Sequence, residues 1–254
     1  IISLMPEDGC TLSFGANSSS YCVIGSTGSP NKVYCNMLQD VSIGKNVTSI
    51  SAYAFYNCYS LASVTIPTGV TSISIYAFYN CYSLASVTIP TGVTSIGINA
   101  FYDCYSLASI TIPESVTSIG NSAFQSCYSL VSVTIPTGVT SISDRDFNSC
   151  YSLASITIPD GVTSIGNYAF SSCHSLASIT IPESVTSIGN YAFSSCYGMR
   201  YYDFSACTAI PALSNSNAFS GIPSDCQMLI PSALYDNWKS ATNWKTYASK
   251  MVSV

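Results

Sequence analysis

The sequence predicts an α/β repeat fold, in which a solenoid of 23-residue coils carries a parallel β-sheet on one face and is capped at both ends. Three observations support this prediction. A cysteine, an Ile-Pro pair and a phenylalanine each recur every 23 residues along most of the 254-residue chain. A fixed period of about 20–50 residues is typical of stacked supersecondary units, so one repeat array is favoured over one or two globular domains.

Residues 1–34 come before the first repeat and are predicted to be an N-terminal capping segment. Two turn-rich stretches, 15–20 and 25–31, lie between short apolar runs, and this pattern indicates a hairpin. Cys10 and Cys22 flank the first of these stretches and are the best candidates for a disulfide bond.

Residues 35–226 hold the repeats, with the template C-x-x-L-x-x-V-x-I-P-x-x-V-x-x-I-x-x-x-A-F-x-x. The apolar positions recur in register, so stacked coils are expected to bury them as eight ladders of like residues. Nine strands at a spacing of about 4.8 Å would make a stack roughly 40 Å long. In the unit that starts at Cys58, the inward positions are Leu61, Val64, Ile66, Val70, Ile73, Ala77, Phe78 and the following Cys81.

The sequence of each unit predicts one coil that consists of three segments. Residues 64–66 are β-branched and alternate between apolar and polar, which is typical of a strand. Pro67 ends the strand because it has no N–H to donate to a ladder. A second short extended stretch follows at Val70 and Ile73, and residues 77–78 are expected to begin a one-turn helical return.

The first and last repeats depart from the template, as expected of coils that close an array. Gly44 stands where other repeats have the strand proline. Near the other end, Met199, Tyr202 and Phe204 fill the Leu, Val and Ile positions. Phe219 comes 26 residues after the previous ladder phenylalanine, so three residues are inserted there.

Residues 227–254 are predicted to be the last strand and a helical C-terminal cap. Residues 228–231 supply a ninth strand, and residues 232–254 are expected to be helical. The apolar side chains available to close the last coil are Leu234, Trp238, Trp244, Tyr247 and Met251.

Composition argues against several classes of partner. Charged residues make up 7% of the chain, and its seven Lys and Arg residues are too few for the basic field that nucleic acid requires. No apolar run approaches the ~18–20 residues that cross a bilayer, and residues 1–8 lack the pattern of a signal peptide. We expect no nucleic-acid binding, no membrane insertion and a monomer.

The cysteine ladder is expected to be reduced and buried. A spacing of 23 residues offers no local C-x-x-C pair for zinc, and stacked parallel side chains do not face each other as a disulfide requires. We therefore expect neither a metal nor another cofactor. The ladder comprises Cys35, Cys58, Cys81, Cys104, Cys127, Cys150, Cys173 and Cys196.

The residue after each ladder cysteine is the best candidate for a binding surface. It should face outward in a row, and tyrosine is enriched at recognition surfaces because it joins apolar area to a hydroxyl group. The structural alternative is stacking that buttresses neighbouring coils. A second outward row holds Tyr56, Tyr79 and Tyr102. The candidate binding residues are Tyr59, Tyr82, Tyr105, Tyr128, Tyr151 and Tyr197.

No catalytic device is predicted. His174 is the only histidine and replaces a tyrosine of this row, so it is a substitution and not a placed base. One repeat carries the charged run Asp144, Arg145, Asp146, in which Asp146 takes the place of the inward alanine. A buried charge must be paired, so we expect an ion pair with Arg145, and a cation or ligand site is the alternative.

Outward Ser and Thr residues form two further rows along the strands, beginning with Ser63 and Thr65. They indicate a ladder of cross-strand hydroxyl pairs on an uncharged sheet. A regular hydroxyl array also suits ice, so an ice-binding surface is a second interpretation.

The unit L-x-x-V/I-x-I-P-x-x-V-x-x-I-G-x-x-A-F-x-x-C resembles the leucine-rich repeat of BspA-type surface proteins of host-associated bacteria and some parasitic protists, over roughly residues 35–230. The tail around residues 230–231 and 241–244 is similar to C-terminal segments of such proteins. The uniform copies and the tyrosine after each cysteine depart from a loose family consensus. The resemblance implies a cell-surface or secreted module for adhesion to a host or matrix protein or glycan, with no catalytic motif. The alternative is a structural spacer that displays other domains of a larger surface protein.

Overall fold

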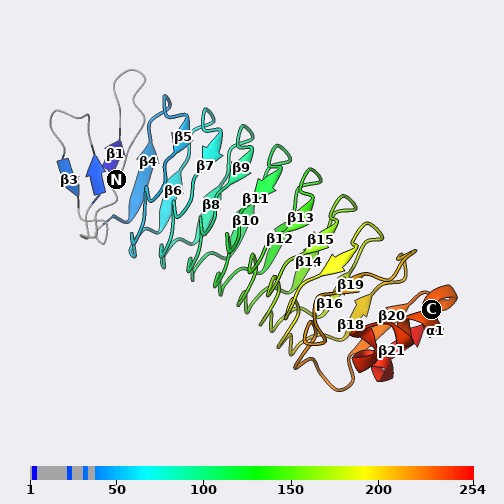
Figure 1. Ribbon diagram of the computed structural model, residues 1–254. Helices are drawn as coiled ribbons and strands as arrows, with labels where there is room; N and C mark the ends of the chain where they lie inside the picture. Colours follow the sequence, from blue (N-terminus) through cyan, green and yellow to red (C-terminus); the bar gives the residue numbers. More distant parts are fainter. Residues whose placement is uncertain (1, 5–21, 25–30, 34–37) are drawn as a thin grey trace.

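The computed structural model describes residues 2–4, 22–24, 31–33 and 38–254, which form one elongated stack of coils (Figure 1). Each coil adds one short strand to a parallel sheet, and that strand pairs with the strands one coil earlier and one coil later. Val64, for example, pairs with Val41 and with Val87. The predicted solenoid of 23-residue coils is confirmed.

This long sheet is divided between two neighbouring coils into parts of seven and four strands. The first part contains, in spatial order, β1 (Ile2–Leu4), β4 (Asp40–Ile43), β6 (Ser63–Thr65), β8 (Ser86–Thr88), β10 (Ser109–Thr111), β12 (Ser132–Thr134) and β14 (Ser155–Thr157). The second part contains β16 (Ser178–Thr180), β18 (Tyr201–Asp203), β20 (Gln227–Ile230) and β21 (Met251–Ser253). Strands β1 and β21 lie at the two ends, beyond the strands that the sequence predicts.

The second extended stretch of each coil is present as a two-residue strand. These strands also pair in parallel from coil to coil, and their row is interrupted once, between β11 and β13. The first group contains β5 (Ser49–Ile50), β7 (Ser72–Ile73), β9 (Ser95–Ile96) and β11 (Ser118–Ile119). The second group contains β13 (Ser141–Ile142), β15 (Ser164–Ile165), β17 (Ser187–Ile188) and β19 (Ala212–Leu213).

The third side of the coil, which we call the turn side, contains turns in every described repeat, so the predicted helical return is wrong. Two residues per coil adopt a left-handed conformation, as Tyr76 (φ 56°) and Asn80 (φ 60°) do, and a right-handed helix cannot continue through them. Alternate N–H groups point to the next coil instead; the N–H of Phe55 donates to the carbonyl of Ala77 at 2.7 Å. The backbone is therefore paired between coils on this side as well.

Eight ladders of inward side chains fill the stack, as predicted. In the coil 58–80, every inward position is buried, from Leu61 at 0% exposure to Ile66 at 8%. The phenylalanine ladder is continuous from Phe55 to Phe193, with neighbouring ring centroids 5.0–5.7 Å apart. Because each side chain meets its own kind in the next coil, one set of packing contacts serves the whole stack.

The irregular last coils keep the same core. Met199, Tyr202 and Phe204 are buried in the positions predicted for them. The ring of Phe219 stacks on that of Phe193 at 5.3 Å, so the ladder continues across the inserted residues. The insertion therefore lies outside the core.

The C-terminal segment contains helices and then a strand, and it packs against the last coils. Trp238 and Trp244 are buried, and their ring centroids lie 5.4 and 5.2 Å from that of Phe204. Residues 251–253 were expected to be helical but form β21, which pairs in parallel with β20. Among the described residues, no helix has both the length and the apolar character that crossing a membrane requires. The helical elements are η2 (Ser232–Leu234), α1 (Tyr235–Ser240) and η3 (Trp244–Lys250).

At the N-terminal end, β2 (Cys22–Ile24) pairs antiparallel with β3 (Asn31–Val33). This pair lies within the segment predicted to be a cap. Cys10 and Cys35 lie outside the described residues. The pairing of Cys10 with Cys22 therefore stays a prediction, as do the capping roles and the boundaries 1–34, 35–226 and 227–254.

Candidate binding surfaces along the solenoid

The inward cysteines make a hydrogen bond that the sequence did not reveal. The thiol of Cys81 donates to the carbonyl of Phe55, with an Sγ–O distance of 3.2 Å, and the bond recurs for each ladder cysteine from Cys104 to Cys196. These cysteines are buried free thiols, as predicted. Burial raises the pKa of the Cys58 thiol to about 12, and a protonated thiol is a poor nucleophile. The ladder is therefore part of the structural core.

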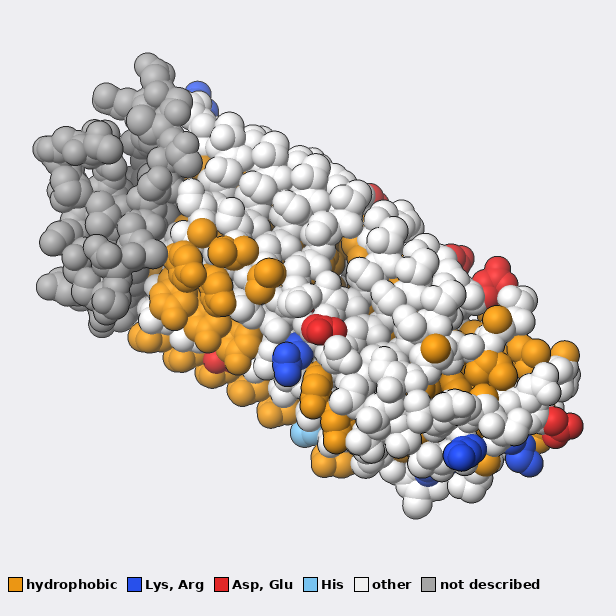
Figure 2. Space-filling model, in the orientation of Figure 1, with side chains coloured by type: hydrophobic (Ala, Val, Ile, Leu, Met, Phe, Trp, Pro, Cys, Tyr) orange, Lys and Arg blue, Asp and Glu red, His pale blue; other side chains and the backbone are white. Residues whose placement is uncertain are grey.

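On the outside of the coils, the candidate tyrosines form one unbroken stack. Neighbouring rings lie 4.6–5.0 Å apart between centroids and within 25° of parallel. The stack follows the lower edge of the molecule, where one pale-blue histidine interrupts the orange side chains (Figure 2). We define the tyrosine row as Tyr59, Tyr82, Tyr105, Tyr128, Tyr151, His174 and Tyr197. The structure thus brings all six candidate residues together with the histidine.

Stacking decides which part of each ring a partner can reach. The faces cover one another, so a partner meets ring edges and hydroxyl groups. Tyr197, at the end of the row, is 61% exposed, whereas Tyr82, Tyr105 and Tyr128 are half-buried. The hydroxyl of Tyr105 donates to Asp103 Oδ2 at 3.0 Å. Burial is the main cause of the raised pKa of Tyr105, and this hydrogen bond is the second.

A broader apolar patch covers the turn side of the early coils. The rings of Tyr56, Tyr79 and Tyr102 stack at 5.0 and 4.8 Å, and Ile98 beside them is 46% exposed. Figure 2 shows a contiguous group of hydrophobic side chains toward the N-terminal end of the described coils. We define the apolar patch as Tyr53, Tyr56, Ile75, Tyr76, Tyr79, Ile98 and Tyr102. Sequence reasoning found only one of its columns, although the adjacent columns were visible in the same repeats.

The ion pair predicted for Asp146 is wrong. Its carboxyl group is 1% exposed and accepts hydrogen bonds from the N–H groups of Ser143 (3.1 Å) and Ala123 (3.3 Å). The guanidinium of Arg145 lies over the Tyr168 ring, 5.0 Å from its centroid. Burial raises the pKa of Asp146 to about 8, so protonation, and not pairing with Arg145, relieves the cost of the buried charge.

Asp146 lies beside the interruption between β11 and β13. In an ordinary coil the N–H at this point bonds to the previous coil, as Gly120 N–H does to Ile96 O at 2.9 Å. The corresponding N–H of Ser143 donates a hydrogen bond to the Asp146 carboxyl group instead. The Ser143 hydroxyl donates to Ile119 O at 2.7 Å. Within the described part of the chain, no group of three or more His, Cys, Asp or Glu residues could hold a metal ion.

The turn side of the later coils carries a polar ladder. The N–H of Asn167 donates to Asp144 Oδ1 at 2.7 Å, and the N–H of Asn190 donates to Asn167 Oδ1 at 2.8 Å. These three residues occupy the column that holds Ile75 and Ile98 in earlier coils. The surface therefore changes from apolar to polar along a single column.

The serine and threonine rows face outward from the long sheet. Ser63 and Thr65 are exposed on either side of the buried Val64, and the rows stay in register, with Ser86 opposite Ser109. The hydroxyl groups pair in register between coils, and no hydrogen bond joins one to another along the described strands β6 to β16. Apart from Ser63, whose hydroxyl donates to Asp40 Oδ1, these hydroxyl groups are open to solvent or to a partner.

Comparison with known proteins finds a family model that matches these repeats. A model of the BspA type leucine rich repeat region, in six copies, matches residues 31–154 and 140–237. A search among curated proteins found no match.

Two solved structures are similar over substantial parts of the chain. A leucine rich repeat protein of T. pallidum is 35% identical, with a TM-score of 0.54, over 56% of this chain and 66% of that protein. A leucine rich cell surface protein from Faecalibacterium prausnitzii is 25% identical, with a TM-score of 0.53, over 94% of this chain and 93% of that one. This chain thus spans just under two thirds of the T. pallidum protein and nearly all of the other.

Proposed function

The chain belongs to the BspA-type leucine-rich repeat family, and from that premise we propose that it is a non-enzymatic binding module, secreted or displayed on the cell surface. We propose further that the tyrosine row adheres to a host or matrix protein. The F. prausnitzii relative, which is named a cell surface protein, supports the proposed location.

The observation that carries this proposal is the unbroken aromatic row along the array. Its six tyrosines and one histidine repeat at 4.6–5.0 Å and offer similar contacts along the whole stack. Each contact is modest, but several of them engaged together by one partner give useful affinity. An extended or repetitive partner suits this layout better than a small molecule.

The geometry of the rings favours a protein over a glycan. Sugars bind aromatic residues mainly through ring faces, and the faces in this row are covered by neighbouring rings. Edges and hydroxyl groups remain, and these suit the amide groups and apolar side chains of a polypeptide. The terminal face at Tyr197 is the most exposed aromatic surface of the row.

The non-enzymatic part of the proposal rests on His174. Its ring is sandwiched between Tyr151 and Tyr197, at 4.7 and 5.0 Å, as one more member of the row. A histidine that acts as a general base needs a nucleophile and an orienting partner within hydrogen-bond reach. Stacking between two tyrosines gives this histidine a packing role instead.

The test is a triple substitution in the middle of the row. Tyr82, Tyr105 and Tyr128 are replaced together by Ser, and binding to arrayed matrix proteins and glycans is measured beside circular dichroism. We expect loss of the protein ligand with an unchanged spectrum. We also expect weak salt dependence, because the row carries few charges to screen. A matched control changes Thr88, Thr111 and Thr134 on the strand face to Ser and should bind normally.

Retained affinity in the tyrosine triple variant, with an intact fold, would move the binding site elsewhere. The alternative function is a structural spacer, and the continuous stacking favours it because stacked rings stiffen the array. A spacer would bind nothing on the array as the wild-type chain and would lose stability in the triple variant.

A further inference from the structure

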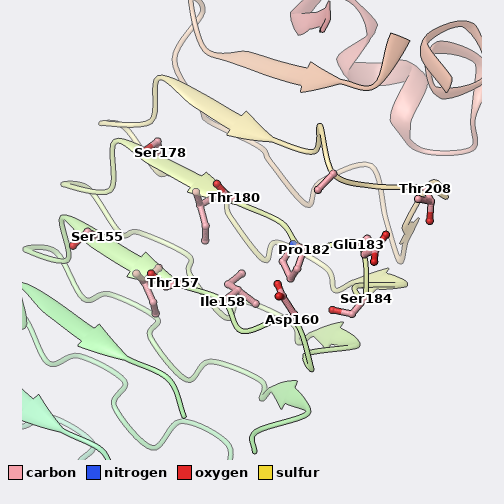
Figure 3. A pocket seen from close by; sticks show the side chains of 13 residues that line it. Ser155, Thr157, Ile158, Asp160, Ser178, Thr180, Pro182, Glu183, Ser184 and Thr208 are labelled. Carbon is pink, nitrogen blue, oxygen red and sulfur yellow. The ribbon is translucent and has the colours of Figure 1, made fainter. Parts of the chain in front are cut away.

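A groove lies on the strand face where the long sheet divides. It has a volume of about 840 Å³ and spans the coils of β14 and β16 (Figure 3). Ser155, Thr157, Ser178 and Thr180 line it with hydroxyl groups, and Figure 3 shows Asp160 and Glu183 in the loops that follow the two strands. None of its lining residues is basic or aromatic. The groove is therefore a different chemical surface from the tyrosine row.

The two carboxylates differ from the other acidic residue in the same column. Glu114 accepts hydrogen bonds from the N–H (3.0 Å) and hydroxyl (2.9 Å) of Thr137, one coil later. Asp160 is followed in its column by Glu183, and Glu183 by Ala206, so neither meets a hydroxyl donor like that of Thr137. Within the described residues, Asp160 and Glu183 make no hydrogen bond or ion pair. Two uncompensated negative charges thus lie one coil apart beside the groove.

A third carboxylate lies next to the groove. Asp203 of β18 pairs with Thr180 of β16, which lines the groove, so its charge adds to those of Asp160 and Glu183. A groove that carries charge of one sign attracts ligands of the opposite sign and raises their local concentration.

The division of the sheet raises the question of whether a ligand could insert between β14 and β16. Strands β14 and β16 belong to separate sheets, so their backbone ladder is interrupted at the floor of the groove. Their Cα atoms still approach within 8 Å, which is less than the roughly 9.6 Å that an inserted strand would need. A ligand therefore lies across the strand face and does not enter the sheet.

We propose that this groove binds an extended, cationic polypeptide segment, whose Lys or Arg side chains pair with Asp160 and Glu183 while its backbone meets the Ser and Thr hydroxyl groups. Charge complementarity selects the occupant, and open hydroxyl groups supply donors and acceptors to its main chain. This site is independent of the tyrosine row and of the function proposed for it.

The experiment uses the full chain and a labelled ten-residue peptide of alternating Lys and Ser, with fluorescence anisotropy as the readout. Asp160→Asn combined with Glu183→Gln should weaken binding about tenfold, the order expected for the loss of two exposed charge pairs. Raising the salt concentration should weaken wild-type binding similarly. Glu114→Gln should bind as wild type does, because Thr137 already engages that carboxylate.

A second control separates the groove from net charge. Asp225→Asn combined with Asp236→Asn removes two exposed charges far along the chain and should leave peptide affinity unchanged. Equal weakening in both double variants, or no binding by the wild-type chain, would overturn the proposal. Competition by spermine at equal strength would also overturn it, because the occupant would then be a small polyamine. The tyrosine triple variant should still bind the peptide, so failure of the proposed function would be visible separately.

Discussion

The turn side of the early coils and that of the later coils share one backbone and differ in surface. Between residues 53 and 102, aromatic rings and exposed isoleucines form the apolar patch. From Asp144 to Asn190, the column of Ile75 and Ile98 holds a hydrogen-bonded polar ladder instead. The backbone bonds are nevertheless alike, since Tyr76 N–H donates to Ile98 O and Tyr168 N–H donates to Asn190 O, each at 2.9 Å. Inward ladders and backbone pairing thus maintain the fold, while outward columns are free to vary.

The largest expected effect tests whether the two halves share one core. Phe101→Ala in the early half and Phe170→Ala in the later half should each cost about 3–5 kcal/mol, because both leave a cavity in the same fully buried ladder. Denaturant unfolding measures the loss. Tyr128→Ala, on the half-buried outer row, should cost about 1 kcal/mol or less. A large difference between the two phenylalanines would show that the halves differ inside as well as outside.

The next effect concerns Asp146, which stands between the two halves. Its pKa is raised to about 8 in the folded chain by burial, against about 3.9 when unfolded. The folded state holds the proton between these values, so this contribution to stability is full below about pH 4 and is lost as the pH rises to about 8. The slope should reach at most ~1.4 kcal/mol per pH unit.

Asp146→Ala is the matching variant, because alanine occupies this position in the neighbouring coils. It should flatten the pH dependence of the unfolding free energy and let the Ser143 N–H bond to the preceding coil. Denaturation between pH 4 and 8, with amide exchange at Ser143, measures both. The same slope in wild type and variant would contradict the assignment.

The smallest expected loss of stability concerns one outward residue from each half of the turn side. Asn167→Ala removes the acceptor for Asn190 N–H and a donor to Asp144, so a loss of about 1–2 kcal/mol is expected. Ile98→Ala removes a side chain that is already 46% exposed and should cost less than about 1 kcal/mol. Thermal or chemical denaturation of both variants decides the order. The reverse order would mean that the patch stabilises the fold and is more than a surface.

The core could be predicted because it depends only on periodicity. Apolar residues that recur in register, as Leu61 and Phe78 do, must meet their own kind when the coils stack. The position of the tyrosine row followed from the same argument. The stacking that covers its ring faces could not be predicted in this way, because it depends on how side chains orient between coils.

The turn side could not be predicted because local preferences are overridden there. Ala77 and Phe78 suggest a helix, but Tyr76 and Asn80 are left-handed without being glycine. Such conformations persist only when surrounding contacts impose them, and here those contacts come from the next coil. The groove at β14 and β16 and the partners of Asp146 likewise depend on the spacing between coils, which one repeat does not encode.

The in-register ladders also govern how such a chain can change in length over generations. Removal of residues 81–103 would join Asn80 to Cys104 and leave every ladder with like neighbours on both sides. Loss of a single residue would instead displace side chains of that coil from their columns, unless a loop absorbed the change, as the loop before Phe219 absorbs three extra residues. A change of length by whole 23-residue units adds or removes complete coils, and these are the changes that the fold accepts. The length of the solenoid can therefore change by whole coils, while the outward residues of each coil vary independently.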